Sequence, residues 1–223
     1  MRSESEIRQV SATPHPPLRL ARKSSVDQSE DPDTSLMLRV RQGDREAFRV
    51  LYEKYTGQIT RFAANFVGLR SRGEELAQEV FLQVYRARDR YEPRAKFSTW
   101  LYTIAHNLCL NEVRRFDYRG KVESLDRDED DPDRPPRPDL ADPTALDGEA
   151  VVAGKEVEQR IHELVAELPE SQRTALILSR TENLRYQEIA EILSCSEQAV
   201  KSLIFRATQH LKEGLKGYVE DPE

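Results

Sequence analysis

The chain has 223 residues, of which 38% are hydrophobic and 33% are charged. Its mean hydropathy is -0.71, so small helical modules joined by solvated linkers fit the composition better than one large core. No apolar run reaches about 18 residues, so no membrane-spanning helix is expected, and the charged N-terminus is not a secretory signal. Cys109 and Cys195 lie far apart, which favours a reducing, cytoplasmic compartment over a disulfide framework or a zinc motif.

The net charge of -6 hides an uneven distribution. Residues 117–150 contain 12 acidic and five basic side chains, together with five prolines. Because proline lacks a backbone donor and like charges repel, this segment is predicted to be an extended acidic linker. The rest of the chain is nearly neutral and can carry basic faces, so the acidic total does not argue against a nucleic-acid partner.

Helical periodicity indicates a first module over residues 33–116, preceded by a tail, residues 1–32, that is predicted to be disordered. Asp44 is a candidate N-cap for the first long helix of this module. Apolar residues recur three or four positions apart along that helix, from Phe48 to Phe66. This spacing places them on one buried face.

Two further helices are predicted in the same module. Ser71 and Glu74 have the spacing of a capping box, which predicts a helix beginning after Ser71. Ser98 is the candidate cap of a third helix, which extends from Thr99 to about Phe116.

A second helical module is predicted over residues 151–217. Pro169 ends one amphipathic helix and begins another, from Glu170 to about Arg180. A short helix from Tyr186 to Leu193, a tight turn, and a longer helix from Glu197 to about Lys212 then follow. This order is typical of a helix-turn-helix, in which the second helix lies in the DNA major groove.

The sequence therefore predicts an all-α fold. Two small helical domains are joined by the acidic, proline-rich linker, the second domain is a helix-turn-helix, and residues 218–223 form a short charged tail. No strand-like alternation occurs, and the common glycine-rich phosphate-binding loops are missing. No cofactor and no metal are expected.

Four side chains recur on the exposed side of the last predicted helix: Lys201, Ser202, Phe205 and Arg206. Basic side chains contact guanine edges or phosphates, a serine hydroxyl contacts a phosphate or base, and phenylalanine contacts a thymine methyl group. An ordinary solvated helix face is the alternative. Because the helix-turn-helix spacing is present, we favour DNA contact.

Aromatic and basic residues also alternate over a segment that holds only two acidic residues: Tyr85, Arg86, Arg88, Arg90, Tyr91, Arg94, Lys96, Phe97 and Trp100. Aromatic faces stack on unpaired bases and cations follow the phosphate backbone, so the segment suits single-stranded or melted DNA. The alternative is that the aromatic residues belong to the core, with Phe97 the strongest candidate.

Acidic and polar side chains form a face on the second predicted helix: Glu74, Glu75, Gln78 and Glu79. Paired carboxylates are found in acid–base catalysis, but no histidine lies near them in the sequence. A protein-docking surface or a solvated face is the favoured interpretation. His106 and Cys109 are interpreted as packing residues, because no further metal ligands accompany them.

Two groups of motifs together resemble the extracytoplasmic-function (ECF) sigma factors of the bacterial sigma-70 family. The first group is EELAQEVFL (Glu74–Leu82) followed by FSTWLYTIAHNL (Phe97–Leu108). The second is LPESQR (Leu168–Arg173) followed by LRYQEIAEIL (Leu184–Leu193) and VKSLIFRA (Val200–Ala207). The order of the motifs and the length of the linker also agree with that family.

The resemblance implies a role for each motif. Docking on the clamp helices of the polymerase β′ subunit, with the β subunit as a further contact, is assigned to Glu74, Glu75, Leu76, Gln78, Glu79 and Phe81. Reading and melting of the promoter −10 element is assigned to Arg94, Lys96, Thr99, Trp100, Asn107 and Asn111. Reading of the −35 element is assigned to Lys201, Ser202, Phe205 and Arg206. It also implies that an anti-sigma factor holds the chain inactive, and that catalysis belongs to the polymerase, not to this chain.

Three positions depart from the family pattern. Asn183 and Ser194 stand where relatives often have glycine, and Glu75 replaces the usual aspartate. Two other hypotheses remain. In one, the chain is a free-standing helix-turn-helix regulator and the first module is a sensor or dimerisation domain. In the more remote one, it is an enzyme that uses Glu74 and Glu79 or Cys109.

Overall fold

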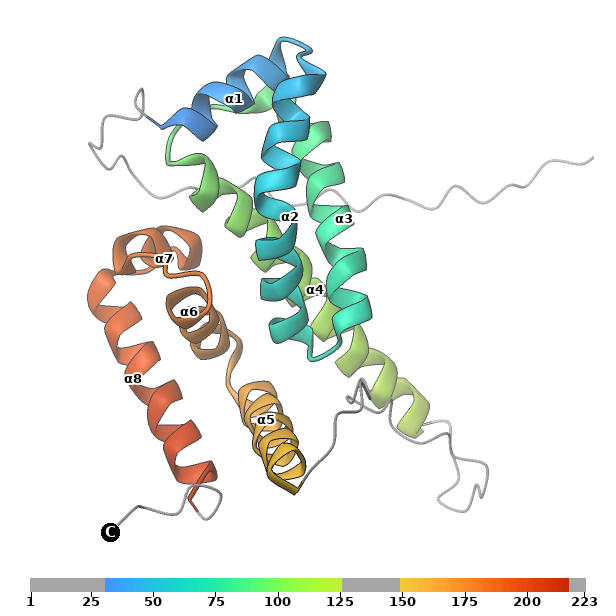
Figure 1. Cartoon of the computed structure of the whole chain (residues 1–223), viewed down its shortest axis with the longest axis vertical. Coiled ribbons are helices and arrows are strands. Elements are labelled where there is room, and N and C mark those ends of the chain that lie inside the picture. Colours follow the sequence, from blue (N-terminus) through green and yellow to red (C-terminus); the bar gives the residue numbers. More distant parts are fainter. Residues whose placement is uncertain (1–30, 126–148, 217–223) are drawn as a thin grey trace, which may run out of the picture.

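The computed structural model describes the backbone of residues 31–125 and 149–216 and the side chains of residues 31–115 and 157–216. Within these residues there are eight α-helices and no strand, which confirms the predicted all-α class. Figure 1 shows the helices in two groups that lie against each other. Residues 1–30, 126–148 and 217–223 lie outside the described residues, as do the predictions that concern them.

The first domain contains α1 (Pro32–Arg41), α2 (Arg45–Val67), α3 (Arg70–Ala87) and α4 (Phe97–Leu125), with a short 3-10 turn, η2 (Arg88–Arg90), after α3. α2 and α3 lie side by side, and α4 crosses them (Figure 1). Side chains from all four helices form the core, including Met37, Leu51, Phe62, Val80 and Leu101.

The pairing of α2 with α3 depends on both ends of α2. Asp44 caps the helix as predicted, because its carboxylate accepts hydrogen bonds from the amides of Glu46 and Ala47. α2 ends at Gly68, whose φ of 77° reverses the chain. The short connection brings Gly73 of α3 against the backbone of α2, where no side chain fits between them.

Two predicted helix caps are wrong. α3 begins at Arg70, with Leu69 at the N-cap position, so Ser71 and Glu74 do not form a capping box. α4 begins at Phe97, so Ser98 lies inside the helix. The amide of Phe97 instead donates to the Asp31 carboxylate over 3.0 Å.

Asp31 therefore belongs to the folded domain, although the sequence analysis placed it in the disordered tail. Its carboxylate also accepts a hydrogen bond from the Thr34 hydroxyl, over 2.7 Å. Burial raises the pKa of Asp31, but the hydrogen bonds from Phe97 and Thr34 outweigh burial and hold it below its usual value. The Asp31 carboxylate thus joins the start of α1 to the start of α4.

The predicted linker is also shorter than the sequence analysis proposed. α4 continues to Leu125, and α5 (Glu149–Glu167) begins before the predicted boundary at residue 150. Adding a residue to an existing helix costs less than starting a new one, so α4 can continue past residue 116, the end predicted from the sequence.

The second domain contains α5, α6 (Glu170–Arg180), α7 (Tyr186–Leu193) and α8 (Glu197–Gly214). The bounds of α6 and α7 match the prediction. Pro169 marks the start of α6 and the turn at Ser194 marks the end of α7, so both helix ends are encoded locally.

The two residues that stand where relatives often have glycine lie before and after α7. Asn183 and Ser194 both adopt left-handed conformations, with φ of 53° and 52°. Ser194 ends α7, and Ser196 caps α8 by accepting a hydrogen bond from the amide of Ala199. Val200 of α8 is fully buried, and α7 packs against α8.

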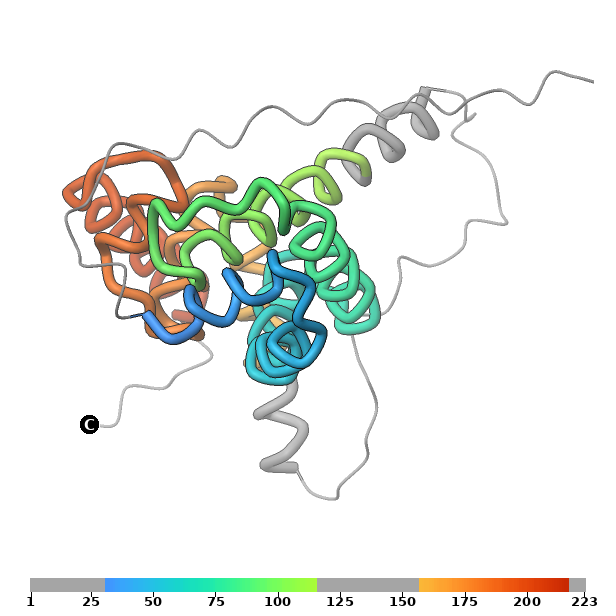
Figure 2. The backbone as a smooth tube through the Cα atoms, turned by 90° about the horizontal axis from the view of Figure 1, so that it is seen from above, coloured from blue at the N-terminus to red at the C-terminus, as the bar shows by residue number. Residues whose placement is uncertain are grey.

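The two domains share one continuous apolar core. The largest core cluster joins side chains of α1 to α4 with side chains of α6 to α8. Seen from above in Figure 2, the second domain lies alongside α4. Because α4 carries predicted DNA-reading residues, this contact affects which of them are accessible to DNA.

Candidate nucleic-acid and protein interfaces

The predicted DNA-reading face of α8 is open to solvent. Lys201, Ser202, Phe205 and Arg206 are all exposed, and Phe205 has 64% of its surface accessible. Lys201 and Phe205 are four residues apart, as are Ser202 and Arg206, so each pair lies along one side of the helix and the two pairs are adjacent. A large exposed phenylalanine between two cations is an unusual solvated face and a suitable surface for a DNA groove.

The predicted protein-docking residues of α3 divide into two sets. Glu74, Glu75 and Gln78 are exposed, whereas Leu76 and Phe81 are buried in the domain core. In this structure the last two support the helix from behind and do not reach its outer surface.

Leu82 lies on the outer face of α3 and was missed by the sequence analysis. It is 48% exposed, and Tyr85, one turn further along, is 37% exposed. The signal in the sequence was the spacing, because Leu82 follows Gln78 by four residues and so shares its face. Tyr85 also packs on Phe48 of α2, with ring centroids 5.2 Å apart.

A network of ion pairs centred on Arg72 lies beside this surface of α3. The guanidinium of Arg72 forms ion pairs with Glu75, with Glu79 at 3.3 Å and with Glu112 of α4 at 2.8 Å. The hydrogen bond to Glu112, followed by the other carboxylates, raises the pKa of Arg72 above its usual value. The network holds α3 and α4 together and limits the orientations of two acidic side chains on the docking face.

The six residues predicted to contact the −10 element are not presented together. Asn107 and Asn111 are exposed on α4, and Arg94 is exposed in the preceding loop, where it pairs with Glu92 at 2.5 Å. Trp100 is only 5% exposed.

Trp100 lies in an aromatic cluster. Its ring centroid is 4.8 Å from that of Tyr91 and 6.0 Å from that of Phe97. Tyr91, Phe97 and Trp100 are therefore core residues in this conformation, which is the alternative interpretation of the aromatic segment.

Of the other two predicted −10 residues, one pairs with the second domain and the other is buried. The ammonium of Lys96 is 2.7 Å from the carboxylate of Glu188 in α7. Thr99, one turn further along α4, is fully buried, and its hydroxyl has no hydrogen-bond partner.

His106 lies on the same side of α4 and contacts the second domain. Its Nδ1 is 3.1 Å from the hydroxyl of Thr174 in α6. Burial lowers the pKa of His106 to about 4, with smaller, opposing effects from Glu170 and Arg114. The imidazole is therefore neutral at neutral pH.

We expect acid to destabilise the chain through His106. Because the unfolded histidine takes up a proton near its ordinary pKa of 6.5, the free energy of unfolding falls as pH drops from there toward about 4. Urea unfolding of the wild type and of His106→Gln over this range measures the effect, and the variant should show a shallower pH dependence. His162→Gln, on α5, is the matched control and should retain the wild-type slope. Equal slopes for all three proteins would contradict this assignment.

Cys109, Glu74 and Glu79 were considered for catalysis, and each lies in a different environment. Burial raises the pKa of the Cys109 thiol to about 12, which keeps it protonated. Glu74 is exposed and Glu79 is held by Arg72. Among residues 31–115 and 157–216, no three histidine, cysteine, aspartate or glutamate side chains are grouped as metal ligands would be. None of the described helices is both long enough and apolar enough to span a membrane.

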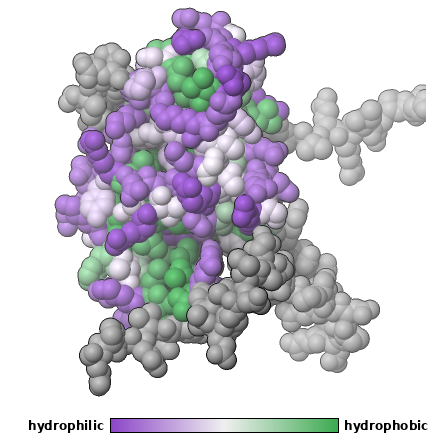
Figure 3. Space-filling view, in the orientation of Figure 1, coloured by the Kyte–Doolittle hydropathy of each residue, from purple (hydrophilic) through white to green (hydrophobic). Residues whose placement is uncertain are grey.

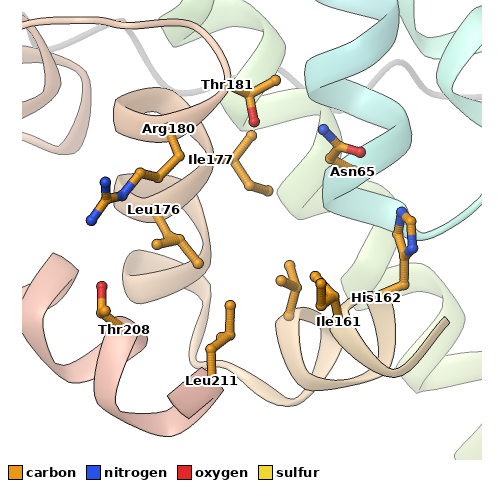
Figure 4. A pocket seen from close by; sticks show the side chains of 10 residues that line it. Asn65, Ile161, His162, Leu176, Ile177, Arg180, Thr181, Thr208 and Leu211 are labelled. Carbon is orange, nitrogen blue, oxygen red and sulfur yellow. The ribbon is translucent and has the colours of Figure 1, made fainter. Parts of the chain in front are cut away.

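A cavity of about 450 Å³ opens between α2 and the second domain (Figure 4). Its walls are mainly apolar, and Asn65 of α2 lies at one side. The apolar wall residues come from α5, α6 and α8: Ile161, Val165, Leu176, Ile177 and Leu211. Figure 3 shows a hydrophobic area over the lower part of the molecule, in the region of α5 and α8. None of the predicted DNA-reading side chains lines the cavity.

Solved structures share this fold. The structure of CnrH in complex with the cytosolic domain of CnrY aligns with a TM-score of 0.61 and 20% identity, covering 84% of this chain and 99% of that one. The sigma factor RpoE from Bartonella quintana, in complex with the anti-sigma factor NepR, aligns with a TM-score of 0.56 and 22% identity, covering 76% and 96%.

Sequence relatives are more similar. The RNA polymerase sigma-H factor of Pseudomonas aeruginosa is 32% identical over 200 residues, covering 84% of this chain and 96% of the relative. The ECF RNA polymerase sigma-E factor of Escherichia coli K12 is 30% identical over 181 residues, covering 79% and 91%.

Two family models match the two domains. Residues 51–117 match sigma-70 region 2, and residues 158–211 match sigma-70 region 4. These matches favour the sigma factor hypothesis over the free-standing regulator, because both domains are accounted for. The chain therefore belongs to the extracytoplasmic-function group of the sigma-70 family, the RNA polymerase sigma factors that direct core polymerase to promoters.

Proposed function

We propose that this sigma factor uses three separate surfaces: α3 for core RNA polymerase, the start of α4 with its preceding loop for the promoter −10 element, and α8 for the −35 element. The observation that carries the proposal is the exposed α8 face, where two cations flank an accessible Phe205. The observed helix-turn-helix geometry presents such a helix to a major groove.

The proposed polymerase surface consists of Glu74, Glu75, Gln78 and Leu82. Carboxylates and an amide surround an exposed leucine, which suits a partner with basic and apolar side chains. Leu76 and Phe81 are assigned a supporting role, since they pack behind this surface.

A double variant tests the polymerase surface. Gln78→Ala/Leu82→Ala is expected to weaken binding to core polymerase about tenfold or more, since burying a leucine side chain in an interface contributes about 1.5–3 kcal/mol. Binding is measured with a fluorescently labelled chain titrated with purified bacterial core polymerase. Glu213→Ala, exposed on α8, is the control and should bind as the wild type does. A double variant with wild-type affinity would contradict the proposed surface.

The proposed −10 surface combines the exposed Asn107 and Asn111 of α4 with Arg94 and Lys96, and the buried Thr99 supports it from within the domain. Amide side chains can bond to the edges of unpaired bases, and cations hold the phosphates of a melted strand. Trp100 supports the loop from within the aromatic cluster, and it reaches a base only if that cluster rearranges.

We also propose that the chain acts in the bacterial cytoplasm, has no active site of its own, and is held inactive by an anti-sigma factor. The support for that partner is the fold shared with RpoE, which is bound to NepR in the solved complex. Purification of the native chain from resting and induced cells tests the proposal. We expect a second protein to accompany the chain in resting cells, and recovery with polymerase alone under both conditions would contradict this.

A further inference from the structure

The loop that precedes α4 is held at both ends and exposed in the middle. It connects η2 to α4 and begins at Tyr91. Tyr91 is only 2% exposed and Phe97, the first residue of α4, is fully buried, whereas residues 92–94 are exposed. The groups that hold the two ends therefore decide where the middle of the loop, with Arg94, lies.

Both ends of this loop contact α1, which lies beside the start of α4 (Figure 2). At one end, the Asp31 carboxylate accepts the hydrogen bond from the amide of Phe97 over 3.0 Å. At the other end, the guanidinium of Arg41 donates to the carbonyl of Tyr91 over 3.4 Å. The hydroxyl of Tyr91 also lies 3.5 Å from that of Thr34. α1 and the residue before it thus bridge the two ends of the loop.

α1 is itself fixed on α2. Asp33 is only 6% exposed, and its carboxylate accepts a hydrogen bond from the Tyr55 hydroxyl over 2.5 Å and another from the Lys54 ammonium over 2.6 Å. Met37 and Val40 of α1 are buried in the domain core. A buried carboxylate with two donors is costly to displace. α1 therefore relates the position of the loop to that of α2.

Asp31 is placed to position DNA-binding groups and not to bind DNA itself. The first amides of a helix lack partners within the helix, and a carboxylate that accepts from one of them fixes the start of that helix. Asp31 does this for α4 at Phe97. Its negative charge would repel a phosphate backbone, so direct contact with a DNA strand is disfavoured.

We propose that α1 is a positioning element for −10 recognition, in which Asp31 and Arg41 fix both ends of the loop before α4 and so present Arg94 to a melted strand. The proposal rests on the proposed −10 role of this loop and of α4. It adds a helix that lies before the residues matching sigma-70 region 2, which begin at residue 51. Loosening this contact should impair promoter melting and leave polymerase binding intact.

The order of the loop can be measured in the free chain. Trp100 is the only tryptophan in the sequence, and its ring centroid is 4.8 Å from that of Tyr91, so its fluorescence reports on the loop. Asp31→Ala is expected to raise the acrylamide quenching constant of Trp100 about threefold, because the loop opens locally. Asp31→Asn should retain the wild-type value, since its amide oxygen can still accept the hydrogen bond from Phe97.

Asp44→Ala is the matched control for this measurement. It removes the carboxylate that caps α2, outside the contacts of the loop, and should leave the quenching of Trp100 unchanged. Urea unfolding of each variant shows whether the two alanine variants lose similar stability. Wild-type quenching in Asp31→Ala, or equal increases in Asp31→Ala and Asp44→Ala, would overturn the positioning of the loop by Asp31.

Promoter melting tests the consequence for function. Each variant is combined with saturating core polymerase and a promoter selected by run-off transcription, with a fluorescent base analogue in the −10 element. Asp31→Ala should form open complexes about fivefold less well, which is the factor that one helix cap contributes. Because this variant removes a negative charge, an effect of charge alone would strengthen DNA binding instead. Asp31→Asn and Asp44→Ala should melt the promoter as the wild type does.

The outcomes separate this inference from the proposed function. Normal melting by Asp31→Ala with a loosened loop would overturn the positioning role, and so would weakened binding of that variant to core polymerase. A wild-type chain that melts no promoter would instead contradict the −10 role on which the inference rests. The quenching of Trp100 is measured without DNA or polymerase, so it tests the contact with α1 in either case.

Discussion

Replacing Gly73 with alanine is expected to lower the free energy of unfolding by about 2–3 kcal/mol. A Cβ at this position would lie 2.6 Å from the amide nitrogen and 2.7 Å from the Cβ of Ala64 in α2. These atoms belong to the backbone or are fixed directly to it, so no side-chain rotation relieves the overlap. α2 and α3 must separate, and the core between them is disturbed. Urea unfolding followed by circular dichroism measures the loss.

Gly57→Ala is the matched control for this prediction. Gly57 lies inside α2, and nothing approaches its added Cβ within 4 Å. Alanine at an open helical position should stabilise the chain by about 0.5–1 kcal/mol. A Gly73→Ala variant as stable as the wild type would show that α2 and α3 do not approach as closely as described.

Replacing Arg206 with alanine is expected to reduce −35-dependent transcription about tenfold, since one good side-chain contact to a base or phosphate contributes about 1–3 kcal/mol. Arg206 is exposed on α8, away from the domain contact and the proposed polymerase surface. The measurement is the yield of run-off transcripts with saturating core polymerase, so that differences in polymerase binding do not contribute.

Lys212→Ala controls for the loss of a positive charge on the same helix. Lys212 is also exposed but lies in the last turn of α8, beyond the reading face. It should retain transcription near the wild-type level. An equal loss in both variants would indicate a general electrostatic effect, and no loss in Arg206→Ala would contradict its proposed role.

Local signals made part of this fold predictable. Asp44 and Pro169 each act within one turn of their own helix, so the start of α2 and of α6 could be predicted from the sequence. The turn after α7 was predicted in the same way. Its Ser194 adopts the left-handed conformation at a position where relatives often have glycine, although serine is less suited to it than glycine. Fold class and domain organisation followed from such signals.

Long-range contacts decided the features that the sequence analysis missed. Asp31 caps α4 from a position 66 residues earlier, which no local spacing reveals. The pairing of Lys96 depends on where α7 packs, since its partner Glu188 lies on that helix. Leu76 and Phe81 carry the family motif but face the core, because a motif identifies a helix and not the side of each residue.

The most direct test of the sigma factor account is run-off transcription with purified bacterial core polymerase, with and without this chain, on a pooled promoter library from the source genome. We predict transcripts with defined starts that appear only when the chain is present, and their upstream regions should share −35 and −10 sequences. A chain that yields no transcript and does not comigrate with core polymerase would contradict the account.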